Sequence, residues 1–188
     1  MPICVGDDPS DSTLTAAIDY VISNRGAEDI KVILMAISGP TIEPYLADKI
    51  KQTNQAGILI IVPAGNEGKD IPTEKRYPCA LTQQCDGMLC IGATEHSKMT
   101  TTYFSNFGTY VDIAAPGNII TTGNDGGFTT MLGTSPASAI VAGVAAMLYS
   151  VNPGLKPRDI KKILKGTSQK GLKDFSRKFA LPFGRVDA

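Results

Sequence analysis

Apolar residues recur at helical spacing in two segments of the first third of the chain. Residues 12–24 and residues 43–55 each place apolar side chains on one face, which predicts two amphipathic helices. Ser12 or Thr13 would cap the first helix, and Gly26 would end it as the residue just past the last turn. Each helix therefore has one face that needs a core to pack against.

Three short runs around these helices are almost entirely apolar: Lys31–Ala36, Gly57–Val62 and Met88–Ala93. Such runs are typical of strands that are covered on both faces, as in a parallel sheet. The order of strand, helix and strand implies a right-handed crossover between parallel neighbours. The pattern therefore predicts an α/β fold with a mostly parallel sheet flanked by helices.

The last third of the chain combines a turn-rich segment with two further helices. Residues 121–130 contain three glycines with Asn and Asp between them, which predicts a hairpin turn. Residues 139–149 are apolar nearly all round and predict a core helix. This helix would begin at Pro136, with Ser135 as its N-cap. Residues 157–165 predict a final, basic helix.

Length and composition indicate one globular domain, with 188 residues, 43% of them hydrophobic and 19% charged. Eighteen basic residues balance eighteen acidic ones, and this zero net charge argues against nucleic-acid binding. Nine basic residues lie in 156–178, which indicates a solvated helix face or a patch for an anionic partner. No apolar run reaches the roughly 18–20 residues of a membrane span. The acidic N-terminus lacks the apolar core of a signal peptide.

The four cysteines do not follow the spacing of a zinc site, and no metal site is predicted from the sequence. Cys79 and Cys90 flank a polar loop, so a disulfide between them is our first expectation. The alternative is that all four cysteines are free thiols in a reducing compartment. The single histidine, His96, is expected to be exposed in a loop.

Two residues stand where nucleophilic chemistry could occur. Ser135 lies at the start of the apolar helix, where free N–H groups and the helix dipole stabilise negative charge. Asn66 lies in a glycine-flanked loop directly after a strand, where its amide could donate to an oxyanion. Each residue alone is also compatible with an ordinary role, as a helix cap and as a turn residue.

Several blocks in one order carry a more specific signal: Ala64–Gly68 (AGNEG), Phe104–Gly108 (FSNFG), Val111–Gly117 (VDIAAPG), Gly133–Ser135 (GTS) and Val141–Gly143 (VAG). Together these blocks resemble the C-terminal half of the catalytic domain of subtilisin-like serine proteases. The resemblance covers nearly the whole chain. It implies a subtilisin-like three-layer architecture, present here in incomplete form, and the hydrolysis of peptide bonds.

The resemblance also assigns roles. Ser135 matches the nucleophile, and Asn66 matches the donor that, with the Ser135 N–H, holds the oxyanion. The residues that would line the substrate cleft are Ala36, Ile37, Ser38 and Gly39 on one wall, and Ala64, Gly65 and Glu67 around the pocket for the side chain before the cut bond. The implied partners are polypeptide substrates, an inhibitory pro-segment and the missing N-terminal half. The implied location is outside the cell or in a secretory organelle.

No cofactor is required by this chemistry, although Ca²⁺ is an option in the intact protein. Asp112 matches a carboxylate that helps a weak cation site in some relatives, and it could equally be an ordinary surface or capping residue. The sequence shows no strong carboxylate cluster for calcium.

The chain also departs from the family pattern. The triad order is Asp, His, Ser, so the general base and its partner are expected upstream of this chain, and His96 does not take their place. We therefore expect the 188 residues alone to be inactive. Ser38 and Pro136 are unusual at their positions. They favour the alternative of a non-catalytic, peptide-binding pseudoprotease, and a third possibility is a folding fragment with an exposed sheet edge.

Overall fold

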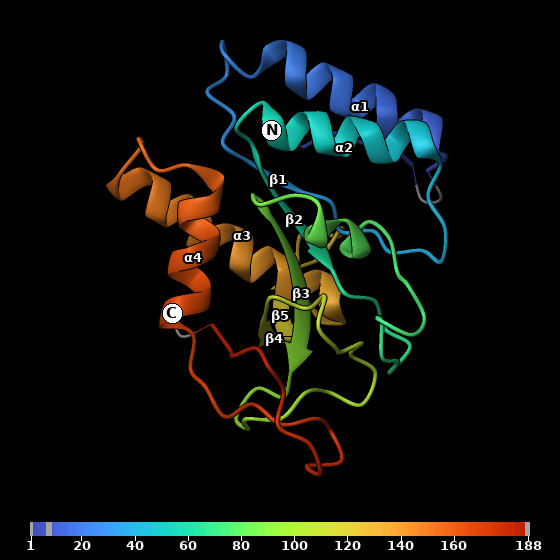
Figure 1. The fold of residues 1–188 in the computed structure, drawn as a ribbon, viewed down its shortest axis with the longest axis vertical. Coiled ribbons are helices and arrows are strands. Elements are labelled where there is room, and N and C mark those ends of the chain that lie inside the picture. The colour runs from blue at the N-terminus through green and yellow to red at the C-terminus, as the bar shows by residue number, and fades with distance from the viewer. Residues whose placement is uncertain (1, 7–8, 187–188) are drawn as a thin grey trace.

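The computed structural model describes residues 2–6 and 9–186 (Figure 1). Its centre is a four-stranded, fully parallel sheet in the order β1-β2-β3-β4. The strands are β1 (Val32–Leu34), β2 (Leu59–Pro63), β3 (Met88–Thr94) and β4 (Ile113–Pro116). The predicted α/β class with a parallel sheet is confirmed.

Helices cover both faces of the sheet, which gives three layers (Figure 1). Side chains alternate along each strand, so Ile60 and Val62 pack in the core with the first two helices, while Leu59 and Ile61 pack in the core with the last two. The helices are α1 (Asp11–Asn24) and α2 (Pro44–Gln55) on one face, and α3 (Thr134–Val151) and α4 (Pro157–Thr167) on the other. A short 3₁₀ helix, η1 (Cys79–Gln83), lies on the α1/α2 side.

The predicted N-cap of the first helix was wrong. α1 begins at Asp11, and the Ser10 side chain caps it by accepting a hydrogen bond from the Thr13 N–H at 3.2 Å. The helix ends at Asn24 with Arg25 as its C-cap, so Gly26 does lie just past its end, but the left-handed residue that follows is Asp29 (φ 48°). An extra stretch of turns separates α1 from the sheet, and helical periodicity gives no information on such a stretch.

The prediction that the first strand is covered on both faces was also wrong. β1 pairs only with β2 in the described sheet, and Leu34 is 39% exposed. β2 and β3, in contrast, are buried at every position. The apolar run at 31–36 therefore contains an edge strand of the described sheet. Side chains of this strand and of α1 line an apolar groove.

The predicted hairpin is present as β5 (Asn118–Thr122) and β6 (Phe128–Leu132), which pair antiparallel around the turn at 123–127. β4 was not recognised in the sequence, because it is a short run broken at its end by Pro116. The outer edge of β4 bonds to the C-terminal segment, through Ala114 N–H to Gly184 and Val186 N–H to Ala114.

α3 starts earlier than predicted. Its N-cap is Gly133, at a φ of 146° that favours glycine, so Ser135 lies inside the first turn and Pro136 occupies the third helical position. Only one face of α3 is buried, and Met147 is 57% exposed on the other. Among the described residues, α3 is the one helix long and apolar enough to cross a membrane, but here its buried face packs on the sheet.

Candidate active site

Two structural ends meet at the candidate site. β2 ends at Pro63 and continues into the loop Ala64–Gly68. The N-terminus of α3 contacts this loop, because the Thr134 N–H donates to Asn66 Oδ1. Sites in open α/β sheets gather at the carboxyl ends of strands, as this one does. Ser135 is partly exposed there, and its Oγ lies 3.4 Å from the carbonyl oxygen of Ala36.

The amide of Asn66 is fixed in one orientation by the start of α3. Its Oδ1 accepts a hydrogen bond from the Thr134 N–H at 2.8 Å. Because a backbone N–H can only donate, the oxygen of the amide must face Thr134 and the NH₂ group must face away. No partner for Asn66 Nδ2 occurs among the described residues, so this donor is free beside the helix that carries Ser135.

The Thr134 side chain ties the loop to the helix. Thr134 is fully buried, and its Oγ1 accepts a hydrogen bond from the Gly65 N–H at 3.2 Å and donates to Asn66 Oδ1 at 3.0 Å. One turn later, Ser138 Oγ donates to the Thr134 carbonyl at 2.8 Å. These contacts hold the Asn66 amide and the first turn of α3 in one arrangement.

A second amide, that of buried Asn106, also holds the loop. Its Oδ1 accepts hydrogen bonds from the N–H groups of Glu67 and Lys69, at 3.3 and 2.8 Å. Its Nδ2 donates to the Ala64 carbonyl at 2.9 Å and to Glu67 Oε2 at 2.6 Å. Asn106 is fully buried, so these four bonds replace water for the whole amide.

Glu67 is the charged residue of the predicted pocket, and it is paired. Its Oε2 lies 3.1 Å from Nε of Arg76, a residue that sequence reasoning had not singled out. Burial alone would raise the pKa of Glu67, but the donors of Asn106 and Arg76 outweigh burial and lower that pKa. The carboxylate therefore stays ionised and anchored.

The remaining predicted cleft residues follow β1. Ala36 and Ser38 are exposed, and Ile37 and Gly39 are partly exposed. Gly39 pairs with Tyr77, because each residue's N–H donates to the other's carbonyl, at 2.9 and 2.8 Å. Segments 36–39 and 64–68 therefore both reach the start of α3, through Ala36 and Gly65, and their role as walls of a cleft stays a prediction.

His96 does not belong to this arrangement. As predicted, its side chain is exposed in the loop after β3. Its backbone oxygen accepts a hydrogen bond from Arg185 at 3.3 Å. Within the described part of the chain, no hydrogen bond joins the His96 ring to Ser135.

Asp112 does not fit a metal ion in this structure. It is buried, and its carboxylate lies 3.1 Å from Lys161 Nζ and 2.7 Å from Lys165 Nζ, both on α4. Its Oδ2 also accepts a hydrogen bond from the Cys90 N–H at 3.1 Å. Two ammonium groups thus form ion pairs with this carboxylate. No cluster of three metal-ligating side chains occurs among the described residues.

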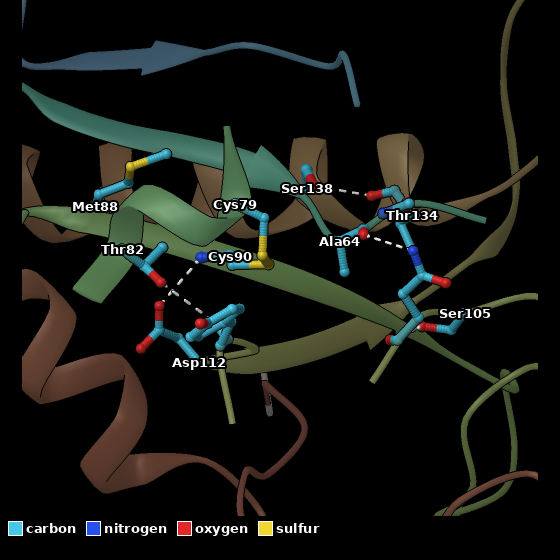
Figure 2. Close-up of a disulfide and its surroundings, with 12 residues drawn as sticks. Ala64, Cys79, Thr82, Met88, Cys90, Ser105, Asp112, Thr134 and Ser138 are labelled. Atoms are coloured by element: carbon cyan, nitrogen blue, oxygen red, sulfur yellow. Dashed lines mark hydrogen bonds between the residues drawn. A yellow bond between two sulfur atoms is a disulfide. The ribbon is translucent and has the colours of Figure 1, made fainter. Parts of the chain in front are cut away.

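The predicted disulfide is confirmed: Cys79 of η1 is bonded to Cys90 of β3, with a Cα–Cα distance of 5.1 Å. Figure 2 shows this bridge next to Asp112, together with Ala64, just past the end of β2, and Thr134 at the start of α3. Cys4 and Cys85 are free, the first exposed and the second buried. Burial raises the pKa of the Cys85 thiol, and the nearby Lys51 and Lys161 only partly counteract it.

A parallel three-layer α/β fold, with a serine in the first turn of a core helix and an outward amide donor on the adjoining loop, defines the subtilisin-like class. The model of the subtilase family matches residues 2–184. Subtilisin-like protease 2 of Trichophyton verrucosum is 36% identical over 141 residues, which is 71% of this chain and 31% of that protein. Subtilisin-like protease 4 of Trichophyton rubrum is 34% identical over 161 residues, which is 83% of this chain and 38% of that protein.

A solved structure of a cold adapted subtilisin-like serine proteinase has a TM-score of 0.82 and 27% sequence identity, and the match covers 96% of this chain and 63% of that chain. The chain therefore belongs to the subtilase family. It spans about a third of the length of the two curated relatives, at 31% and 38%.

Sequence reasoning missed three residues that build this site. Thr134 and Asn106 lie inside matched blocks, but nothing in their spacing indicates that their side chains bond the loop at 64–69. Arg76 lies in a polar stretch without periodicity. Its sequence position gave no signal, because Arg76 is brought beside Glu67 only in the finished fold, where its neighbour Tyr77 pairs with Gly39.

Proposed function

We propose that this chain supplies the nucleophile and the oxyanion site of a serine endopeptidase. Ser135 Oγ attacks the carbonyl carbon of a peptide bond. The resulting oxyanion accepts hydrogen bonds from Asn66 Nδ2 and from the Ser135 N–H. The single observation that carries the proposal is the Asn66 amide, whose oxygen is bound by the Thr134 N–H and whose NH₂ group is left free beside Ser135.

The proposed base is a histidine oriented by an aspartate, both on a part of the protein upstream of these residues. The histidine takes the Ser135 proton during attack and gives it to the leaving amine when the C–N bond breaks. Water then hydrolyses the acyl-enzyme by the same route. This proposal explains why Ser135 has no base among the described residues, and we infer that the 188 residues alone are inactive.

The proposed substrates are polypeptides, bound along the segment 36–39 as an added strand. An inhibitory pro-segment would bind the same cleft. The Cys79–Cys90 bridge supports a secreted protein or one in a secretory organelle, since disulfides persist in oxidising compartments. No organic cofactor enters the proposed reaction, and calcium, if the intact protein binds it, would be held elsewhere than at Asp112.

A fluorophosphonate probe, which labels activated serines, tests the proposal. The N-terminally extended protein would be treated beside the 188-residue chain, a Ser135→Ala variant and a Ser150→Ala control. Ser150 lies on the same helix but is exposed at its far end. We expect the label on Ser135 in the extended protein and in the control, and in neither of the other two.

Absence of label from Ser135 in extended protein that is folded and free of any pro-segment would overturn the proposal. It would favour the non-catalytic alternative, in which the cleft binds peptides without cleaving them. Peptide binding measured by calorimetry on that same sample would then identify the pseudoprotease directly.

A further inference from the structure

Three polar side chains crowd Gly65, in the loop that contacts the start of α3. A Cβ atom added to Gly65 would lie 2.5 Å from Asn106 Nδ2, 2.7 Å from Glu67 Oε2 and 2.9 Å from Ser38 Oγ. Real Cβ contacts are essentially never shorter than 3.0 Å. Three side-chain atoms therefore crowd the space next to Gly65, and a methyl group there would force them to shift.

The Ser38 hydroxyl enters this space from the first wall. Gly65 belongs to the second wall. A Cβ atom on Gly65 would lie only 2.9 Å from Ser38 Oγ, so the two walls are close together at this point. A glycine at position 38 would remove this oxygen and its Cβ. The side chain of Ser38 is thus one of the two obstructions in the pocket.

The Glu67 carboxylate is the second obstruction, and two neighbours hold it although its side chain is 38% exposed. The Nδ2 of buried Asn106 binds Glu67 Oε2 at 2.6 Å, and Arg76 Nε lies 3.1 Å from the same oxygen. The Arg76 side chain is only 14% exposed. Its neighbour Tyr77 is bonded to Gly39 of the first wall, which keeps Arg76 beside the pocket.

We propose that this pocket accepts only small side chains, with Ser38 and Glu67 as its specificity-determining residues and Arg76 as the residue that positions Glu67. This inference rests on the proposed peptidase function. The substrate class is then polypeptides with Gly, Ala or Ser before the cut bond. A large side chain would have to displace the Glu67 carboxylate from both of its partners.

A charged side chain before the cut bond is disfavoured for the same reason. A carboxylate would meet the ionised Glu67, and a guanidinium or ammonium would have to compete with Arg76 for Glu67 Oε2. Neither group has space above Gly65 while Ser38 and Glu67 remain in place. The filled pocket therefore selects by size before it selects by charge.

The test is a series of tetrapeptide anilides that differ only in the residue before the cut bond, with Gly, Ala, Leu, Phe, Glu and Arg. The N-terminally extended protein would be assayed as wild type, Ser38→Gly, Arg76→Ala, Arg76→Lys and the double variant Ser38→Gly/Arg76→Ala. We expect wild type to favour Ala over Phe by at least about 10-fold in kcat/KM. We expect the double variant to reverse this preference.

The ratio between two substrates is measured within one variant, so a general loss of folding or activity does not change it. Arg76→Lys keeps a cation beside Glu67 and should remain closer to wild type than Arg76→Ala. Matched controls are Ser97→Gly and Arg158→Ala, two exposed positions outside the site that should leave the ratio unchanged.

The two proposals fail in different ways. A wild type that labels at Ser135 but prefers Leu, Phe, Glu or Arg overturns the inference on the pocket and leaves the peptidase proposal intact. An unchanged Ala-to-Phe ratio in the double variant does the same. A protein that neither labels at Ser135 nor cleaves any member of the series overturns the proposed function, and the pocket inference with it.

Discussion

At the scale of single residues, the Asn66 amide has one free donor. No described group accepts a hydrogen bond from its Nδ2. The oxygen of the same amide is bound twice, by the N–H and the hydroxyl of Thr134. A free donor on an otherwise fixed amide is the arrangement that stabilises an anion formed during a reaction.

The first prediction concerns this donor. In the N-terminally extended protein, Asn66→Ala should lower kcat about 100- to 1000-fold, because the oxyanion loses one of its hydrogen bonds. KM should stay nearly constant, since the bond forms only in the transition state. Asn124→Ala in the exposed hairpin turn is the control. A rise in KM at constant kcat would instead indicate a role in ground-state binding.

Tyr149 gives a prediction on pH. Its hydroxyl is buried without a hydrogen-bond partner among the described residues, and desolvation, with a smaller effect of Asp159, raises the pKa of Tyr149 from 10.0 to about 12. The unfolded chain therefore releases this proton at a lower pH than the folded chain. Between these two pKa values the unfolded state binds fewer protons, so this group lowers stability as pH rises from 10 toward 12.

Tyr149→Phe should remove both effects. We expect the free energy of unfolding to rise by about 1 kcal/mol at pH 7, because no buried hydroxyl is left unpaired. The gain should increase above pH 10. Urea titrations at several pH values measure it, and Tyr20→Phe, at a residue that is 53% exposed, is the control. A difference that does not grow at high pH would disprove the raised pKa.

At the scale of elements, α4 is held to the sheet by charges as well as by apolar packing. Ile160 and Leu164 enter the core, and Lys161 and Lys165, one turn apart, both approach buried Asp112. Lys161 Nζ also donates to the Met88 carbonyl at 2.7 Å. Part of the basic run in the last third of the sequence is therefore used inside the fold rather than for an anionic partner.

The corresponding prediction ranks three substitutions by unfolding free energy. Asp112→Asn should cost about 3 kcal/mol, because it leaves Lys161 without its buried counter-ion. Lys165→Met should cost less than about 1 kcal/mol, since that side chain is 45% exposed and solvent screens its charge. Lys161→Met should fall between them. Added calcium should not raise the unfolding free energy of any of these proteins through Asp112. A rise with calcium that is lost in Asp112→Asn would show that this carboxylate binds the ion.

The disulfide joins two elements and gives a prediction on cysteine chemistry. Alkylation without reductant should modify Cys4 alone in the folded protein, because Cys85 is buried and its pKa is raised. Denaturation should expose a second thiol, and reduction two more. Intact mass measures each step. Removing the bridge should cost roughly 3 kcal/mol, the value typical of a loop of this size.

At the scale of the whole molecule, hydrophobic runs predict a parallel sheet and the family resemblance implies its three layers, but neither predicts which surfaces are exposed to solvent. Hydrophobic runs identified β1, β2 and β3 because apolar residues cluster there whether or not both faces are covered. For the same reason they could not distinguish the edge strand β1 from the buried β2. The apolar helix α3 likewise gave no sign that Met147 and Val151 would be exposed.

The candidate site shows the same division. The resemblance of the matched blocks to the family assigned roles to Ser135 and Asn66, which their local sequence alone could not do, and those roles stay predictions. The contacts of Arg76, Asn106 and Thr134 join residues between 9 and 69 positions apart, as for Arg76 with Glu67 and Thr134 with Gly65. Such pairs depend on the finished fold, and neither periodicity nor local spacing encodes them.

The exposed apolar surfaces give a prediction for the isolated chain. The outer face of α3, the outer side of β1 and the hairpin side chain Phe128, which is 82% exposed, are all open to solvent. The 188-residue chain alone should therefore bind a dye for apolar surface and form dimers in size-exclusion chromatography. The N-terminally extended protein should do neither. A compact monomer of 188 residues without dye binding would contradict this.

The hydrogen bonds of Asn106 restrict which amino acids this fold can accept at position 106. Its amide uses two donors and two acceptor positions at once, all on backbone or side chain of the loop at 64–69. Asp has the shape without the donors, Leu has neither polar group, and Gln places the same group one carbon further out. In a library of all amino acids at position 106, we therefore expect selection for folded, labelled protein to return asparagine alone.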